Sequence, residues 1–103
     1  MSDPDTISAY VESLPDRIIA TAEKHPMVHM TIERAYIPLI ASDLYRGQIL
    51  TGSHKGDFQE TFGAVMMNAA EHNPQVTFDM HANMARVMAM QLKAGAIARK
   101  RLH

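Results

Sequence analysis

From Asn73 to the C-terminus the chain is almost entirely apolar apart from one narrow polar stripe. The stripe residues fall seven positions apart and are His72, Asp79, Arg86, Lys93 and Lys100. A seven-residue repeat keeps one line of side chains on one side of a helix that has about 3.5 residues per turn. We therefore predict one long helix that is covered around most of its circumference. A chain of 103 residues cannot easily surround such a helix alone, so the pattern indicates a helical assembly.

The predicted helix has two apolar faces of different size. The first is a seam of small residues and two larger ones, spaced alternately four and three: Phe78, Ala82, Ala85, Ala89, Leu92 and Ala96. Alanines let two helix axes approach closely, so residues 78–92 of this seam are the expected oligomer interface. The opposite seam is bulky and rich in Met, and consists of Val76, Met80, Met84, Val87, Met90 and Ile97. Methionine is flexible and polarizable, which suits a surface that adapts to a partner.

The remainder of the chain also has helical patterns. We predict a short helix over residues 7–14, with Asp3 or Asp5 as its cap, and a second helix over residues 16–24 that starts at a capping-box-like pair, Ser13 and Asp16. His25-Pro26 ends that helix because the residue before a proline avoids the helical region. No strand pattern and no internal repeat is evident.

Two further helices complete the predicted fold. One covers 27–48 and is kinked or split by Pro38; the other covers 58–72 and is capped by Asp57, after a loop over 51–56. Asn73-Pro74 would begin the last helix or kink a continuous one. The predicted fold is all-α, a single domain over residues 1–103 in which long antiparallel helices form a hairpin or bundle that is completed by dimerisation.

Composition sets further bounds. The chain has no Cys, which excludes a disulfide scaffold. Its N-terminus lacks the order of a signal peptide, and no apolar run reaches the ~18 residues that span a bilayer, so we expect a cytoplasmic protein without a membrane partner. A net charge of −1 hides a gradient, since no acid follows Asp79. The bases in that region are Arg86, Lys93, Arg99, Lys100 and Arg101.

Catalytic chemistry finds little support, and we predict no enzyme, no cofactor and no metal site. His25, His29 and Glu33 are spaced four apart, as metal ligands on one helix face can be. Pro26 lies between the two histidines and places His25 outside the helix, so a surface coincidence is the favoured interpretation. His81, beside Asp79, could be a buried proton switch, but a satisfied interface residue is the commoner case.

Three short segments resemble the TraM family of quorum-sensing antiactivators. They are Thr31-Ile32-Glu33-Arg34-Ala35, Ala41-Ser42-Asp43-Leu44-Tyr45-Arg46 and Asp79-Met80-His81-Ala82-Asn83-Met84. The basic end 99–101 departs from that family, whose C-terminus is apolar. The resemblance implies an all-helical homodimer that binds a LuxR-type activator, TraR, and keeps it from DNA. It also implies that an apolar residue near Met27 and Met30 takes part in inhibition.

The combined interpretation is a small protein-binding regulator that covers a partner's working face. The expected partner-binding residues are Met27, Met30, Met80 and Met84. One alternative is a nucleic-acid-binding helical protein that uses the basic C-terminal residues, although nucleic acid is not the expected partner. Another is a purely structural oligomer. The salt dependence of binding distinguishes the nucleic-acid-binding alternative from the protein-binding regulator, because phosphate binding weakens steeply as salt rises.

Overall fold

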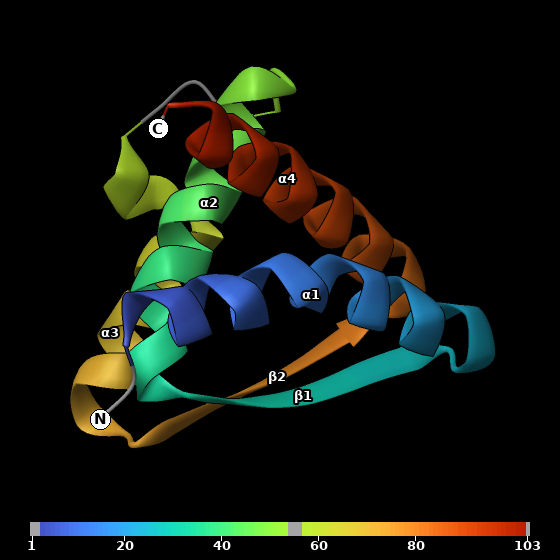
Figure 1. The fold of residues 1–103 in the computed structure, drawn as a ribbon. Helices are drawn as coiled ribbons and strands as arrows, with labels where there is room; N and C mark the ends of the chain where they lie inside the picture. Colours follow the sequence, from blue (N-terminus) through green and yellow to red (C-terminus); the bar gives the residue numbers. More distant parts are fainter. Residues whose placement is uncertain (1–2, 54–56, 103) are drawn as a thin grey trace.

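The computed structural model describes residues 3–53 and 57–102. Helices and two strands follow one another along this part of the chain (Figure 1). In order, they are α1 (Pro4–Lys24), β1 (Met27–Glu33), the 3-10 helix η1 (Arg34–Tyr36), α2 (Ile37–Leu50), the 3-10 helix η2 (Phe58–Glu60), α3 (Phe62–His72), β2 (Gln75–His81) and α4 (Ala82–Arg101). The mostly helical prediction is confirmed. The chain is nevertheless not all-α, because β1 and β2 pair as an antiparallel ribbon.

The ribbon lies where the sequence predicts helix. In β2, Val76, Phe78 and Met80 are buried and the residues between them are exposed. This is the period of two of a half-buried strand. Asn73 has an extended backbone, with φ −137° and ψ 138°, as the residue before a proline prefers. The polar heptad stripe is therefore divided among α3, β2 and α4, and the long helix begins only at Ala82.

The N-terminal region is one helix rather than two. Asp3 caps α1 as predicted, since its Oδ1 accepts a hydrogen bond of 2.8 Å from the Thr6 N–H. The predicted second start at Ser13 is wrong, because the helix continues through a buried Pro15 and the Ser13 hydroxyl donates to the Tyr10 carbonyl. The predicted stop is confirmed, since α1 ends at Lys24.

The middle helices begin later than predicted. The predicted helix over 27–48, kinked or split at Pro38, is wrong: its first part forms β1 and η1, and Pro38 lies in the first turn of α2. The helix expected from 58 begins at Phe62, where Thr61 Oγ1 accepts a hydrogen bond of 3.3 Å from the Ala64 N–H. Of the predicted loop, residues 51–53 form a turn, and residues 54–56 lie outside the described residues.

The two halves of the chain have the same element order, α1-β1-α2 and α3-β2-α4. Met30 pairs with Phe78, 48 positions further on, and the register runs outward from that pair, so a two-fold axis relates the strands. The ribbon ends obey the same relation. Arg34 N donates to Pro74 O at 2.9 Å, and Ala82 N donates to Pro26 O at 3.0 Å. The structure therefore contains an internal repeat, and we call residues 48 positions apart counterparts.

The repeat is visible in the sequence only once this offset is known. Identical counterparts include Ala22 and Ala70, Glu23 and Glu71, Pro26 and Pro74, Val28 and Val76, Ala41 and Ala89, Leu44 and Leu92, and Gly47 and Gly95. The prediction that the chain has no internal repeat is therefore wrong. Similar apolar residues elsewhere in the two halves are conservative exchanges, which hide the relation from inspection of the sequence.

Helices α2 and α4 cross through two glycines that are counterparts. A Cβ added at Gly47 would lie 1.6 Å from the Gln91 carbonyl oxygen, and one added at Gly95 would lie 1.7 Å from the Asp43 carbonyl oxygen. Only glycine allows backbones to approach this closely. The crossing and the inner face of the ribbon together enclose the core, in which Leu44 and Leu92 are also counterparts.

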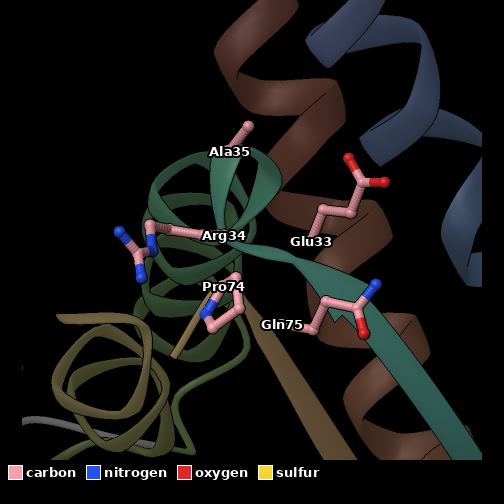
Figure 2. A pocket seen from close by; sticks show the side chains of 5 residues that line it. All are labelled: Glu33, Arg34, Ala35, Pro74 and Gln75. Carbon is pink, nitrogen blue, oxygen red and sulfur yellow. The ribbon is translucent and has the colours of Figure 1, made fainter. Parts of the chain in front are cut away.

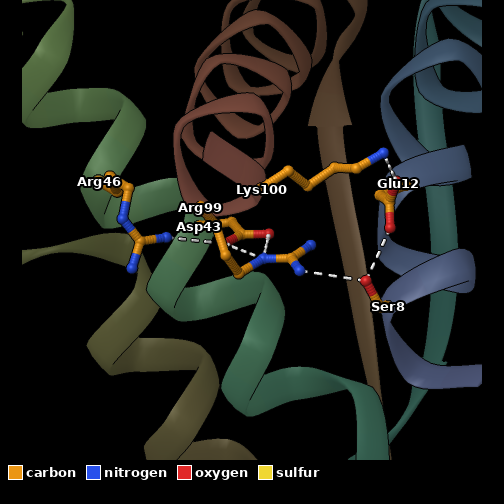
Figure 3. A network of polar contacts seen from close by, with 6 residues as sticks. All are labelled: Ser8, Glu12, Asp43, Arg46, Arg99 and Lys100. Atoms are coloured by element: carbon orange, nitrogen blue, oxygen red, sulfur yellow. Dashed lines mark hydrogen bonds and ion pairs between the residues drawn. The ribbon is translucent and has the colours of Figure 1, made fainter. Parts of the chain in front are cut away.

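A buried acid connects three helices (Figure 3). The Asp43 side chain is 0% exposed, and both of its carboxylate oxygens accept hydrogen bonds from Arg99 Nε, at 3.0 Å and 3.1 Å. Arg46 Nη1 donates to the same carboxylate at 2.9 Å, and Arg99 Nη1 donates to Ser8 Oγ at 3.1 Å. Because a buried charge is tolerated only when it is paired, this cluster fixes α4 against α1 and α2.

Candidate protein-binding groove

An apolar groove opens between α2, α3, β2 and α4. Its volume is about 270 Å³, which lies just below the usual range of about 300–1,000 Å³ for small-molecule sites. It is lined by Leu44, Gln48, Phe62, Asp79, Met80, Met84, Val87, Met88 and Gln91. The lining is mostly aliphatic and Met-rich, so it offers contact area and adaptability rather than reactive groups.

Helix α4 supplies the exposed wall of the groove. Met84 is 65% exposed and Val87 is 54% exposed, and both lie on one face of the helix because they are three residues apart. Met90, also 65% exposed, extends this face by one turn. Large apolar side chains that stand together at this exposure form the kind of patch that marks an interaction site.

The floor and the opposite rim come from β2 and α3. Met80 is 8% exposed and Leu44 is 1% exposed, so both are fixed parts of the core that the groove reaches. Phe62 forms the rim, with its ring tilted against Phe78 at a centroid distance of 5.7 Å, and it remains 38% exposed. Val65, one turn further along α3, is 59% exposed. The apolar surface therefore continues beyond the groove on both sides.

The structure separates the four predicted partner-binding methionines. Met80 and Met84 both line the groove. Met27 and Met30 lie in β1, where both are half-buried. Met30 pairs with Phe78 at the two-fold axis of the ribbon. The four residues therefore do not form one surface.

The predicted oligomer interface is mostly buried inside the chain. Ala85, Ala89 and Leu92 are each 0% exposed and Phe78 is 8% exposed, while Ala82 is half-buried. They belong to the core in which α4 packs on α1 and α2. The close helix contact that the alanine seam predicts is made within one chain, so the buried residues of the seam are unavailable to a second copy.

Sequence reasoning did not select Val87 as a binding residue, although it placed Val87 in the Met-rich seam. That seam was the usable signal, because its part on α4, Met84, Val87, Met90 and Ile97, is exposed. Phe62 and Met88 carried no such signal. Their place in the groove depends on how α3 and β2 pack against α4, and this packing follows from the ribbon.

A second depression lies at the end of the ribbon and has a volume of about 570 Å³. It is lined by Glu33, Arg34, Ala35, Pro74 and Gln75 (Figure 2). Arg34 points to one side, where its Nε donates to the Asn73 carbonyl at 3.0 Å, while Glu33 and Gln75 point to the other (Figure 2). Because its polar groups diverge, this open surface does not build a site for one ligand.

The histidine spacing does not assemble a metal site in the described part of the chain. No group of three or more His, Asp or Glu comes together there. His29 faces outward on β1 and pairs with Asp79 of β2. Glu33 stands four residues along the same extended strand, which corresponds to about 13 Å. His81 is exposed, so it is not a buried proton switch.

The basic residues of α4 are largely engaged inside the chain. Arg99 binds Asp43, Lys100 Nζ lies 2.7 Å from Glu12 Oε1, and Lys93 Nζ lies 3.4 Å from Asp16. Arg86 Nη2 donates to the Ala22 carbonyl at 3.1 Å. These pairings reduce the positive charge that α4 can present to phosphates.

The chain matches no protein-family model, no curated protein and no solved structure. Among the helices of residues 3–53 and 57–102, none is both long and apolar enough to cross a bilayer.

Proposed function

We propose that this chain is a small protein-binding regulator that covers a partner's working face through the α3–β2–α4 groove. The observation that carries the proposal is the exposed apolar wall of α4, Met84 at 65% and Val87 at 54%. Burying such side chains favours association by about 25 cal/mol for each Å² of apolar surface removed from water. Among the described residues that line the groove, most are apolar and none forms a reactive constellation, which favours contact over chemistry.

The TraM resemblance makes a LuxR-type transcriptional activator the first partner to test. Under this proposal, the chain is an antiactivator in the cytoplasm, and two copies associate. The basic residues of α4 support a nucleic-acid role less well, because four of the five expected contacts are paired within the chain.

The test uses a purified LuxR-type activator bound to its DNA site, with release of the DNA followed by gel shift. The wild-type chain should release the DNA. Met84→Glu should weaken release at least tenfold, because burying an unpaired charge in a contact carries a desolvation cost. Ile49→Glu is the matched control, since Ile49 is an exposed apolar residue of α2, 44% exposed, that does not line the groove.

Met27→Glu and Met30→Glu test the β1 contact that the resemblance implies. If they abolish release while Met84→Glu does not, the partner binds the ribbon side and the groove is not the site. If the wild-type chain fails to release any LuxR-type activator tested, the antiactivator role is refuted. The broader protein-binding role is then tested by recovering partners from the native host with wild-type and Met84→Glu chains.

A further inference from the structure

The internal repeat shows what covers the corresponding surface in the first half of the chain. The counterparts of Met84, Val87 and Met88 are Tyr36, Leu39 and Ile40. The first turns of α1 lie over them. The Tyr10 ring stacks on the Tyr36 ring at a centroid distance of 4.0 Å. Under this cover, Ile40 is 2% exposed and the other two are half-buried.

Ile7 and Val11 complete this cover. Ile7 lines an open depression of about 420 Å³ together with Leu39 and Ser42, and Val11 is fully buried. The residues that seal the first half therefore stand at positions i, i+3 and i+4 of a helix, as Ile7, Tyr10 and Val11. This spacing places three side chains on one helix face.

In the second half, the described residues that correspond to these turns are not α-helical: residues 52–53 lie in a turn, and Phe58–Glu60 form the 3-10 helix η2. The counterparts of residues 4–13 are residues 52–61, and α3 begins only at Phe62. Phe58, the counterpart of Tyr10, packs edge-on against Tyr45 of α2 at a centroid distance of 5.4 Å. Phe58 therefore contacts Tyr45, which is not the counterpart of Tyr36, the residue that Tyr10 covers. The groove lies where the repeat would place the first turns of α1.

The exposed surface beyond the groove, on the same helices α3 and α4, also differs from its counterpart in the direction that favours a partner. In the first half, Arg17 and Ser42 are polar, and the Arg17 guanidinium lies 5.5 Å from the Tyr10 ring centroid. Their counterparts Val65 and Met90 are apolar and are 59% and 65% exposed. A surface that had only lost its cover would keep a polar rim. This one has apolar residues where the covered half has polar ones.

We propose that the groove seats an amphipathic helix of a partner protein, in the place that the first turns of α1 occupy over the first half. The inference rests on the proposed function and adds the partner's secondary structure. The partner segment needs about three helical turns, or ~15 Å, with apolar side chains at i, i+3 and i+4. Recognition of this kind is the common helix-in-groove mode.

The repeat also predicts what the partner helix does not need. In the first half, Glu12 and Ser8 of α1 meet Lys100 and Arg99. The counterparts of these two bases are Gly52 and Thr51, which are uncharged. The partner helix is therefore selected by its apolar face and requires no acidic residues at those positions.

A second copy of this chain fits the groove less well. The exposed apolar stripe that it could offer lies on α4, which already forms a wall of the groove. A second copy could use this stripe only in a symmetric contact that places α4 of one copy against α4 of the other. Light scattering separates the cases. A wild-type dimer that Met84→Glu converts to a monomer would overturn the proposal in favour of self-association.

The decisive experiment builds a copy of the first turns of α1 into the second half of the chain. Residues 52–61 are replaced by a second copy of residues 4–13, which places Ile, Tyr and Val over the groove in the expected register. The grafted segment would start beside the groove. Ser53, which follows α2, accepts through its Oγ a hydrogen bond of 2.8 Å from Nε2 of the groove residue Gln91. The matched control is the same graft with Ile7→Ser and Val11→Ser in the copied segment only.

We expect the graft to protect the methyl groups of Met84 and Met88 from a dissolved paramagnetic agent, as measured by NMR of methyl-labelled methionine. We also expect Tm to rise by about 5 °C. The serine control should show neither effect. A protein partner that depends on Met84 should lose at least tenfold in affinity for the graft and keep its affinity for the control.

The two proposals fail in different ways. If Met84 stays as accessible in the graft as in the wild type, the groove does not accept a helix and this inference is overturned, even where a partner still depends on Met84. If the graft covers Met84 but no partner depends on that residue, the helix seat stands and the regulator function is refuted. A graft that does not fold is replaced by a cross-linked helical peptide of residues 3–14 added to the wild-type chain. Failure of that peptide to shift the Met84 signal more than its Ile7→Ser, Val11→Ser version overturns the inference.

Discussion

The α2–α4 crossing allows a prediction in which two physical effects have opposite signs. Gly95 lies inside α4, and replacing an interior helix glycine by alanine stabilises an isolated helix by about 1 kcal/mol. In this chain the new Cβ would lie 1.7 Å from the Asp43 carbonyl oxygen. Real Cβ atoms stay at least 3.0 Å from such a neighbour, so the helices would have to separate by about 1.3 Å.

The cost of that separation exceeds the gain in propensity. The atom in the way is backbone, which cannot rotate aside as a flexible side chain can. Overpacking typically costs about 1–3 kcal/mol and occasionally more, and the separation also loosens the packing of the buried Leu44 and Leu92. We expect Gly95→Ala to lower the free energy of unfolding by about 3 kcal/mol. For a chain of this length, the loss corresponds to a fall in Tm of about 12–24 °C.

Thermal unfolding followed by circular dichroism measures the effect. Gly47→Ala should behave alike, because its Cβ would lie 1.6 Å from the Gln91 carbonyl oxygen. The double variant should cost less than the sum of the two single variants, since one separation of the helices relieves both clashes. Gly52→Ala is the control. It has φ +74° and no atom within 4 Å of an added Cβ, so only backbone strain of about 1–2 kcal/mol is expected. A Tm for Gly95→Ala equal to or above that of the wild type would refute the reasoning.

Three further predictions concern the polar contacts. Asp43→Ala should destabilise the chain by about 3–5 kcal/mol in denaturant titrations, because it leaves the mostly buried Arg99 without its acid; a loss below 1 kcal/mol would contradict the pairing. Thr61→Ala should cost about 1 kcal/mol through the lost N-cap, whereas Thr61→Ser should be nearly neutral. The hydrogen bond from Lys100, followed by that from a serine, lowers the pKa of Glu12 below its usual 4.5. The stability that the ionised Glu12 contributes is therefore present above pH 4.5 and is lost as pH falls through the lowered pKa. Glu12→Gln should flatten the decline of Tm in acid. An unchanged decline would exclude the contact of Glu12 with Lys100 as a cause.

Helix identity was predictable where local signals were strong. Asp3, one of the two predicted caps, and the stop at His25-Pro26 follow from short-range backbone preferences, and both are confirmed. The predicted split of a helix at Pro38 is wrong, because Pro38 lies in the first turn of α2 and the residues before it form β1 and η1. The ribbon was missed because its residues also satisfy a helical period. Met80 and Met84 lie four apart and read as one helix face, yet Met80 belongs to β2 and Met84 to α4.

The groove could not be predicted from sequence because it depends on partners far apart in the chain. Residues of the alanine seam read as an interface between molecules, since the sequence contained no visible neighbour for them. The neighbour is α2, which comes from the other half of the chain and packs against α4 in the core. The part of the Met-rich seam on α4 is exposed and stays a predicted contact surface, whereas Val76 and Met80 of the same seam are buried. The sequence did not indicate Phe62 at the rim of the groove.

The paired strands also constrain how fast the chain can fold. Every partner in the ribbon is distant in sequence, from Glu33 with Gln75 to Met27 with His81. Helical chains of this size usually fold quickly because most of their contacts are local. Here the backbone must close a loop of some forty to fifty residues before β1 and β2 can pair, and the entropy of that closure comes before any gain from the ribbon. We therefore expect folding to be rate-limited by the meeting of the two halves, with helices α1 and α4 unable to reach their final places until the strands have found each other.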